Sequence, residues 1–275
     1  MSKKKLTVYD MLQLKGKKQI HDVYVNNVEE AVAAEEAGID MIVSAYGMPQ
    51  HGIYGTFDDI KRIREAAPNT HLMSAAPERS FATADEAVRA AYKLLSIGCD
   101  SFYTNNSSEI IKALKRERVP VVSHVGLIPG HANWIGGFRA IGKTAKEAID
   151  VLEHAMELDD AGAIALEVEV VPSKIAEIIT KKVKLLTISM GSGSLCDGQY
   201  LFSQDMLGYN TGHVPRHSKI YRNFKKEYDK LHNERVAAYK EFVNDTENKK
   251  FDDPKITVSI DDREYDQFLK LSDKI

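Results

Sequence analysis

The segment Gly162–Gly193 reads GAIALEVEVVPSKIAEIITKKVKLLTISMGSG, and its pattern decides the fold class. Two short apolar runs within it, Ile164–Glu169 and Lys184–Met190, have the length and composition of buried strands. Between them, Pro172–Lys181 has helical spacing and begins at a proline, whose missing N–H costs nothing at a helix start. A strand, a helix and a second strand in this order predict a pair of parallel strands.

The same alternation continues along most of the chain. Glycine follows the helical patterns at Gly38, Gly98 and Gly162, as expected for helix C-terminal caps. The predicted helices cover Val28–Ala37, Phe57–Ala67, Thr83–Ile97, Ser107–Glu117, Thr144–Asp160 and Pro172–Lys181. The predicted strands cover Gln19–Val25, Asp40–Ser44, His71–Ala75, Asp100–Thr104, Val119–His124, Ile164–Glu169 and Lys184–Met190, with an eighth near Tyr200–Asp205 that could equally be a short helix.

Seven or eight such units predict an α/β fold with a single (β/α)8 TIM barrel, a C-terminal helix and an extra tail. An open doubly wound sheet is the alternative, but no GxGxxG motif follows the first predicted strand. We assign residues 1–243 to the barrel domain, with a helix near Lys219–Val243 as its last element. Residues 244–275 form a C-terminal appendage, in which Lys255–Ile260 has a β-like pattern and Arg263–Leu271 a helical one.

The composition is that of a soluble globular protein, with 43% hydrophobic residues, 28% charged residues and a net charge of −3. We expect no nucleic-acid or membrane partner, because the basic clusters Met1–Lys5 and Lys181–Lys184 are too small for a nucleic-acid platform. Cys99 and Cys196 lack the spacing of a metal site and are expected to be reduced thiols. The N-terminus has no signal-peptide pattern, so we expect a cytoplasmic protein.

Two glutamates at a strand end are the first candidates for chemistry. In a (β/α)8 barrel the catalytic groups lie at the C-terminal ends of the strands. Glu167 and Glu169 end the sixth predicted strand, and residues two apart on a strand point the same way. Two carboxylates in the barrel mouth would raise the pKa of one of them, as a general base requires, or bind a cation. The alternative is one glutamate in the mouth and one in a salt bridge at the rim.

Other polar residues follow the neighbouring strands. His124 ends the fifth predicted strand, where it is either a hydrogen-bonded structural histidine or a catalytic group. The turn Gly191–Gly193 could offer backbone N–H groups to a carboxylate or phosphate, although such turns are common. We therefore take Glu169 and His124 as candidate catalytic residues. The candidate substrate-binding residues are Ser44, Tyr46, Ser74, Tyr103, Asn105, Glu167, Gly191, Ser192 and Gly193.

Several motifs together resemble those of the ketopantoate hydroxymethyltransferase family. Ser123–Pro129, followed by Gly136–Phe138 and Gly142, resembles the family's GHxGLTPQ…GGYxxQG stretch. Glu169–Pro172 resembles its LExVP strand end. The later part of the chain resembles the family's run GIGAGxxxDGQxLVxxDxxG followed by PKFxK. The residues that carry this likeness are, in order, Gly191–Gly193, Cys196–Gln199, Asp205, Gly208 and then Gly212–Arg216. Order and spacing agree over about Val25–Val243, and the combination is more specific than any single motif.

This resemblance implies a barrel of the phosphoenolpyruvate/pyruvate superfamily and a homo-oligomer. It also implies transfer of a hydroxymethyl group from methylenetetrahydrofolate to a small 2-oxo acid. In the family a Mg²⁺ ion chelates the 2-oxo acid and stabilises its enolate, and the glutamate of LExVP removes the proton. That glutamate corresponds to Glu169 here.

The residues that hold the metal in the family are absent from this chain. The family's GDSLG, ADxPF and KxEGG motifs appear here as Ser44–Gly47, Ser74–Glu78 and Tyr103–Ser107. Magnesium prefers hard, anionic oxygen ligands, so Ala45, Ala75 and Asn105 do not make the same site. We therefore expect no metal at the family's position.

Three hypotheses of function follow. The first is an enzyme that forms or cleaves carbon–carbon bonds on a small 2-oxo acid or related carbonyl compound, with Glu169 as base. Electrophilic help would come from the Gly191–Gly193 amides, His124, Tyr46, Tyr103, Asn105 and Arg79. The second is a divergent barrel enzyme with a different reaction, metal-free or using a metal relocated to Glu167, Glu169 or Glu78. The third is a non-catalytic binding or scaffold barrel. A barrel mouth filled by side chains would support this third hypothesis, whereas an open polar pocket would support an enzyme.

Overall fold

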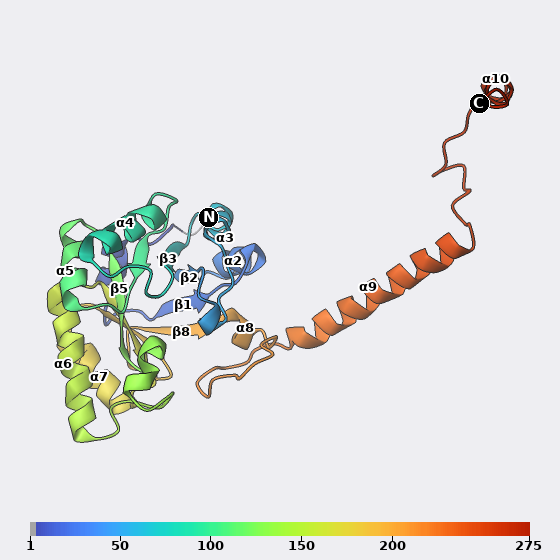
Figure 1. Cartoon of the computed structure of the whole chain (residues 1–275). Coiled ribbons are helices and arrows are strands. Elements are labelled where there is room, and N and C mark those ends of the chain that lie inside the picture. The colour runs from blue at the N-terminus through green and yellow to red at the C-terminus, as the bar shows by residue number, and fades with distance from the viewer. Residues whose placement is uncertain (1–3) are drawn as a thin grey trace. The chain divides into compact units, whose positions relative to one another are not determined.

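The computed structural model describes residues 4–275, and residues 1–3 of the Met1–Lys5 cluster lie outside the described residues (Figure 1). Contacts divide the chain into two compact units, one ending at Arg222 and the other running from Asn223 to Ile275. The second unit contains α9 (Phe224–Glu247) and α10 (Asp262–Ser272). The long helix predicted near Lys219–Val243 corresponds to α9, which lies in the second unit.

The first unit is a closed barrel of parallel strands in sequence order, with β1 paired to β8. This arrangement confirms the predicted (β/α)8 TIM barrel. The strands are β1 (Ile20–Tyr24), β2 (Met41–Ala45), β3 (His71–Ala75), β4 (Ser101–Tyr103), β5 (Val121–Gly126), β6 (Ala165–Glu169), β7 (Leu186–Met190) and β8 (Gly198–Phe202). The segment Tyr200–Asp205, predicted as either a strand or a short helix, contains the end of β8 and most of the short helix α8 (Ser203–Met206). Both predictions are therefore confirmed in part.

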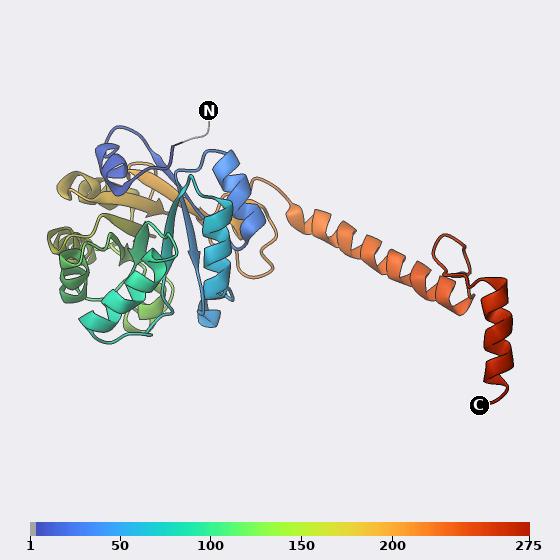
Figure 2. The ribbon, with the colours of Figure 1, turned by 90° about the horizontal axis from the view of Figure 1, so that it is seen from above.

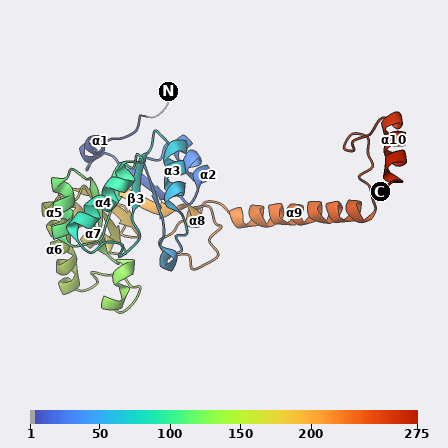
Figure 3. The ribbon, with the colours of Figure 1, turned by 45° about the horizontal axis from the view of Figure 1, so that its top comes forward.

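Helices surround the strands, as Figures 2 and 3 show. The helices expected from the sequence are present as α2 (Val28–Glu36), α3 (Phe57–Ala66), α4 (Ala84–Leu95), α5 (Ser108–Arg116), α6 (Ala145–Ala161) and α7 (Ser173–Lys182). Gly162 follows α6 with a φ of 93°, a left-handed conformation that glycine adopts without a Cβ clash. One further helix, α1 (Val8–Gln13), was not predicted from the sequence; it begins with a capping box between Thr7 and Asp10.

The second unit agrees only in part with the expectations for the tail. The helical pattern Arg263–Leu271 is confirmed by α10. The β-like run Lys255–Ile260 is not a strand in the structure, and that prediction was wrong. Its alternating side chains have no neighbouring strand to pair with, and Val258 is fully exposed. Among residues 4–275, no helix combines the length and apolar character needed to cross a membrane.

Successive side chains along each strand alternate between the outside and the inside of the barrel and so form two apolar layers. Side chains such as Ile42, Leu72 and Val168 point outward and pack in the layer shared with the helices. Met73 and Ile188 belong to a second cluster inside the barrel, which α1 joins through Met11. Because strand side chains alternate, the inward face of β5 and β6 continues to the barrel mouth through polar residues, described next.

Candidate active site

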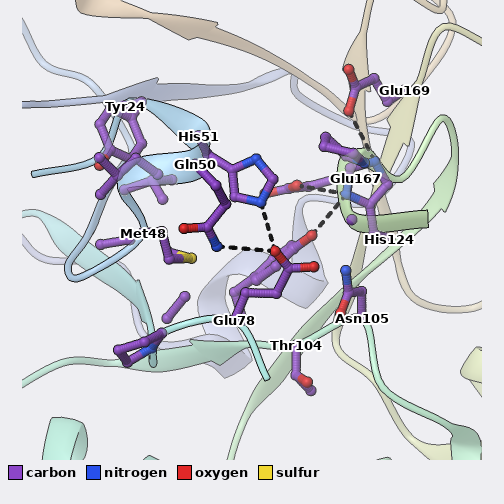
Figure 4. Close-up of a pocket in the computed structure, with 18 of the residues that line it drawn as sticks. Tyr24, Met48, Gln50, His51, Glu78, Thr104, Asn105, His124, Glu167 and Glu169 are labelled. Atoms are coloured by element: carbon purple, nitrogen blue, oxygen red, sulfur yellow. Dashed lines mark hydrogen bonds and ion pairs between the residues drawn. The ribbon is translucent and has the colours of Figure 1, made fainter. Parts of the chain in front are cut away.

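A cavity of about 670 Å³ opens at the C-terminal ends of the strands (Figure 4). This is the end at which barrels of this kind carry their active sites, and the volume suits a small organic ligand. Much of the wall is apolar or aromatic, including Tyr24, Ala45, Ala75, Met190 and Phe202. The polar lining residues include Glu78, Asn105, His124, Glu167 and Glu169.

The central feature is a histidine between two glutamates. In the β5–β6 ladder His124 lies opposite Glu167, and Glu169 follows two residues later on the same face. His124 Nδ1 lies 3.2 Å from Glu167 Oε2, and His124 Nε2 lies 3.2 Å from Glu169 Oε2. The second contact is close enough for an ion pair, although its geometry falls short of a hydrogen bond. Tyr103 completes the group, with its hydroxyl 2.9 Å from His124 Nδ1.

The electrostatics of this group favour a protonated histidine. Burial alone would lower the pKa of His124, but the close contacts and charges of Glu167 and Glu169 outweigh it and raise the pKa to about 9. Burial raises the pKa of Glu167 above its ordinary value, against the opposing effect of His124. The charge of Glu169 adds a smaller contribution that also raises the pKa of Glu167. A positive charge on the imidazole ring therefore lies between the two carboxyl groups at the barrel mouth.

A glycine at the end of β5 lets the two strand ends approach each other. Gly126 has a φ of 91°, and a Cβ there would lie 2.3 Å from the carbonyl oxygen of Glu169. Beside it, the backbone N–H of Leu127 donates to that same oxygen at 3.0 Å. The Glu169 backbone is therefore held from β5, so its side chain starts from a fixed point.

A second carboxylate–histidine pair lies on the loops that follow β2 and β3. Glu78 Oε2 lies 2.7 Å from Nε2 of His51, which ends the short helix η1 (Pro49–His51), and accepts a 3.2 Å hydrogen bond from Gln50 Nε2. Burial would raise the pKa of Glu78, but the hydrogen bonds from His51 and Gln50 prevail and lower it. The Arg79 side chain, which also lines the pocket, reaches the carbonyl oxygen of Gly130 at 3.4 Å.

Another acidic residue lies inside the barrel. Asp22 is on the same face of β1 as Tyr24, which lines the pocket, and is only 2% exposed. Neither of its carboxyl oxygens has a hydrogen-bond partner among the described residues. Burial first, and then the charge of Glu167, raise the pKa of Asp22 well above its ordinary value. The neutral acid is therefore favoured, because an ionised carboxylate would be left without compensation.

The structure brings some of the predicted site residues together and separates others. His124, Glu167, Glu169, Tyr103 and Asn105 line the cavity, as do Glu78 and Arg79. Three predicted binding residues, Ser44, Ser74 and Tyr46, do not contribute to the lining. Ser44 and Ser74 alternate with the inward Ala45 and Ala75, and Tyr46 packs edge-on against Phe57 in the layer shared with the helices.

The glycine-rich turn after β7 has a structural role in the described chain, and its residues are not in the cavity lining. Ser192 Oγ accepts from the Val171 backbone N–H at 2.9 Å and donates to the Val168 carbonyl at 2.8 Å. A Cβ at Gly193 would lie 2.6 Å from Ser173 Cβ, so close packing also explains that glycine. The turn therefore ties the end of β6 to β7.

Sequence reasoning missed several lining residues, including His51, Gln50, Tyr24, Tyr200 and His213. His51 and Gln50 sit in an irregular loop, where no periodicity shows which way a side chain points. Tyr24 could have been predicted from the sequence, because it is the last residue of β1 and its side chain lies on the inward face of the strand.

Comparison with known proteins agrees with this architecture. Residues 5–254 match the family model described as ketopantoate hydroxymethyltransferase. The chain belongs to this family. It is 34% identical to 3-methyl-2-oxobutanoate hydroxymethyltransferase 1 of Methylibium petroleiphilum, over 99% of this chain and 95% of that protein. It is 32% identical to the 3-methyl-2-oxobutanoate hydroxymethyltransferase of Kosmotoga olearia, over 90% and 96% of the two chains. A phosphonopyruvate hydrolase solved with oxalate and Mg²⁺ shares the fold, with a TM-score of 0.52, 12% identity and coverage of 97% and 98%.

The residues of this family member do not fit the magnesium ion that the family resemblance implies. At the corresponding strand ends the cavity presents the methyl groups of Ala45 and Ala75 and the neutral amide of Asn105. Methyl groups cannot coordinate a cation, and one amide supplies a single weak oxygen ligand. Within residues 4–275, no group of three or more histidine, cysteine, aspartate or glutamate side chains is arranged to hold a metal ion.

Proposed function

We propose that this chain is an enzyme that forms or cleaves a carbon–carbon bond next to the carbonyl of a small 2-oxo acid. Glu169 would be the base, and the bond would form or break through an enolate. The observation that carries the proposal is the Glu167–His124–Glu169 group, buried at the strand ends and facing an open cavity of about 670 Å³. An open pocket with a few polar groups at its end, Glu169 among them, favours an enzyme over a scaffold barrel, because side chains would fill the mouth of a scaffold barrel.

The step assigned to Glu169 is removal of a proton from the carbon beside the ketone. The C–H bonding electrons become the new C=C bond, and the π electrons of the carbonyl move to its oxygen. His124 holds the Glu169 carboxylate in place, and the fixed strand end holds its backbone. Methylenetetrahydrofolate, the donor implied by the family, would supply the one-carbon unit to which the enolate carbon bonds. Its carbon–nitrogen bonds would break to release tetrahydrofolate, and water would supply the hydroxyl group. Run backwards, the same steps cleave the bond.

A divergent, metal-free reaction on another carbonyl substrate is the second candidate. It is favoured by one observation, the neutral side chains of Ala45, Ala75 and Asn105 at the family's metal position. Both candidates begin with proton removal by Glu169, so one experiment serves both.

That experiment is a screen of small 2-oxo acids and related carbonyl compounds in heavy water, with proton exchange followed by NMR. Glu169→Gln keeps the shape and removes the proton acceptor, so exchange should slow about 100-fold or more. Glu153→Gln makes the same chemical change at an exposed position on α6 and should leave the rate unchanged. Exchange by Glu169→Gln at the wild-type rate would refute the assignment of the base.

A further inference from the structure

The Glu78–His51 pair is fixed by more than one contact. Oxygen Oε2 of Glu78 contacts both His51 and Gln50, at 2.7 and 3.2 Å. The other oxygen, Oε1, lies against the backbone of Gly130, where an added Cβ would be only 1.9 Å away. The side chains of Glu78 and His51 are 19% and 27% exposed, so the pair is partly sheltered. In Figure 4 this pair and the His124 group face the same pocket from different elements.

Two departures from the family motifs fit together at this pair. The motif ADxPF has phenylalanine where this chain has Glu78, and GLTPQ has glutamine where this chain has Gly130. The first change adds a carboxylate to the pocket wall. The second removes the side chain that would occupy the space of that carboxylate. The chain thus lacks the family's acids at Ala45, Ala75 and Asn105, but it has an additional acid, Glu78, in the space that Gly130 leaves open.

We propose that His51, held by Glu78, takes over the electrophilic role that magnesium has in the family. This inference rests on the proposed function. Nε2 of His51 is occupied by Glu78, whereas Nδ1 has no hydrogen-bond partner among the described residues. The Nδ1–H group binds the carbonyl oxygen of the 2-oxo acid and remains bound to the enolate oxygen.

The step is balanced without metal or redox chemistry. Glu169 takes the proton from carbon, the C–H electron pair forms the C=C bond, and the carbonyl π pair moves to oxygen. The negative charge that develops on that oxygen accepts the His51 hydrogen bond. The carboxylate of Glu78 behind the imidazole fixes the orientation of the ring, as in other histidines paired with an acid. Hydrogen bonds aimed at a developing oxyanion are among the largest contributions to such reactions.

The test uses the full-length protein in EDTA and has two readouts. The first is calorimetric binding of oxalate, a planar dianion that resembles the enolate of a 2-oxo acid. The second is deuterium exchange of the best 2-oxo acid. His51→Gln should weaken oxalate binding about tenfold or more, because a hydrogen bond to a charged group is lost. It should lower kcat for exchange about 100-fold with a smaller change in KM, because the interaction strengthens as charge develops.

Two further variants make the result specific. Glu78→Gln leaves His51 without a charged partner and should give a smaller loss of kcat together with a shifted pH profile. His232→Gln, at an exposed position on α9, should behave like wild type in both readouts. Circular dichroism of each variant should match wild type, and a His51→Asn variant provides a second, smaller replacement.

The outcomes separate this inference from the proposed function. Wild-type oxalate affinity and kcat in both His51 variants would overturn the inference, while the proposed function would stand if Glu169→Gln still abolished exchange. Oxalate binding or exchange that appears only after magnesium is added would also overturn it. If Glu169→Gln exchanges normally but His51→Gln loses oxalate binding, the base is wrong and the electrophile is supported. Failure of wild type to bind oxalate and to exchange any 2-oxo acid would reject both.

Discussion

Replacing Gly126 with alanine should destabilise the barrel at the point where β5 supports Glu169. The left-handed φ of 91° costs an alanine about 1–2 kcal/mol. The new Cβ would also lie 2.3 Å from the Glu169 carbonyl oxygen and 2.6 Å from Val171 Cγ2, so β5 and β6 must separate. Forcing a methyl group into a packed site costs about 1–3 kcal/mol. The sum is about 2–5 kcal/mol, which corresponds to a fall in Tm of about 4–20 °C for a domain of this size.

Scanning calorimetry can separate the two contributions, because the chain contains a matched control. Gly136 also has a positive φ, 80°, but a Cβ there would meet nothing within 4 Å. Gly136→Ala should therefore show the conformational cost alone, about 1–2 kcal/mol. Gly126→Ala should in addition lose exchange activity, since the collision displaces the backbone of the proposed base. Equal falls in Tm for the two variants would refute the claim that the strand ends are in tight contact.

Two further predictions concern buried titratable groups. Because the pKa of Asp22 is raised in the folded state, its contribution should reduce stability as pH rises above about 4, the value in an unfolded chain. Asp22→Asn should therefore be more stable than wild type in urea titrations at pH 7 and equal to it near pH 4. Asp252→Asn makes the same change at an exposed position and serves as the control. A stability difference between Asp22→Asn and wild type that stays constant across pH would contradict this prediction. The pKa of His124 is raised to about 9, so its ion pairs should stabilise the fold fully below about pH 6.5 and lose this effect as pH rises through about 9. The difference in unfolding free energy between wild type and His124→Gln should shrink over that window, and a difference that grows with pH would exclude a protonated His124.

The barrel could be predicted because each strand is a short apolar run bounded by recognisable caps. The same logic located Glu167, Glu169 and His124, since strand alternation puts them on one face of neighbouring strands. It failed for Ser44 because the predicted strand ended one residue before the observed end at Ala45. A shift of one residue moves a side chain to the opposite face of a sheet, so a small error in a boundary excludes the residue from the site.

Loop residues could not be placed in this way. Glu78 and His51 are 27 positions apart in separate connections, and only the folded barrel brings their side chains to 2.7 Å. The Gly191–Gly193 turn lies outside the cavity lining for a different reason, because a glycine-rich sequence looks the same whether it binds an anion or packs closely. A Cβ added at Gly193 would meet Ser173, so the close packing of this turn depends on the neighbouring βα unit.

The distribution of retained and changed residues has a physical cause. The Glu167–His124–Glu169 group lies on strands, where each backbone position is fixed by two neighbouring strands and a change affects the whole barrel. Glu78, His51 and Gly130 lie on connections, whose side chains can be exchanged at little cost to the core. A (β/α)8 barrel can therefore retain a strand-borne base while loops replace the partner that stabilises the oxyanion. The His51–Glu78 pair is a change of this kind, because it leaves the position of Glu169 unaltered. Ala45 and Ala75, in contrast, are the last residues of β2 and β3, where a neutral side chain replaces a family acid without altering the strand.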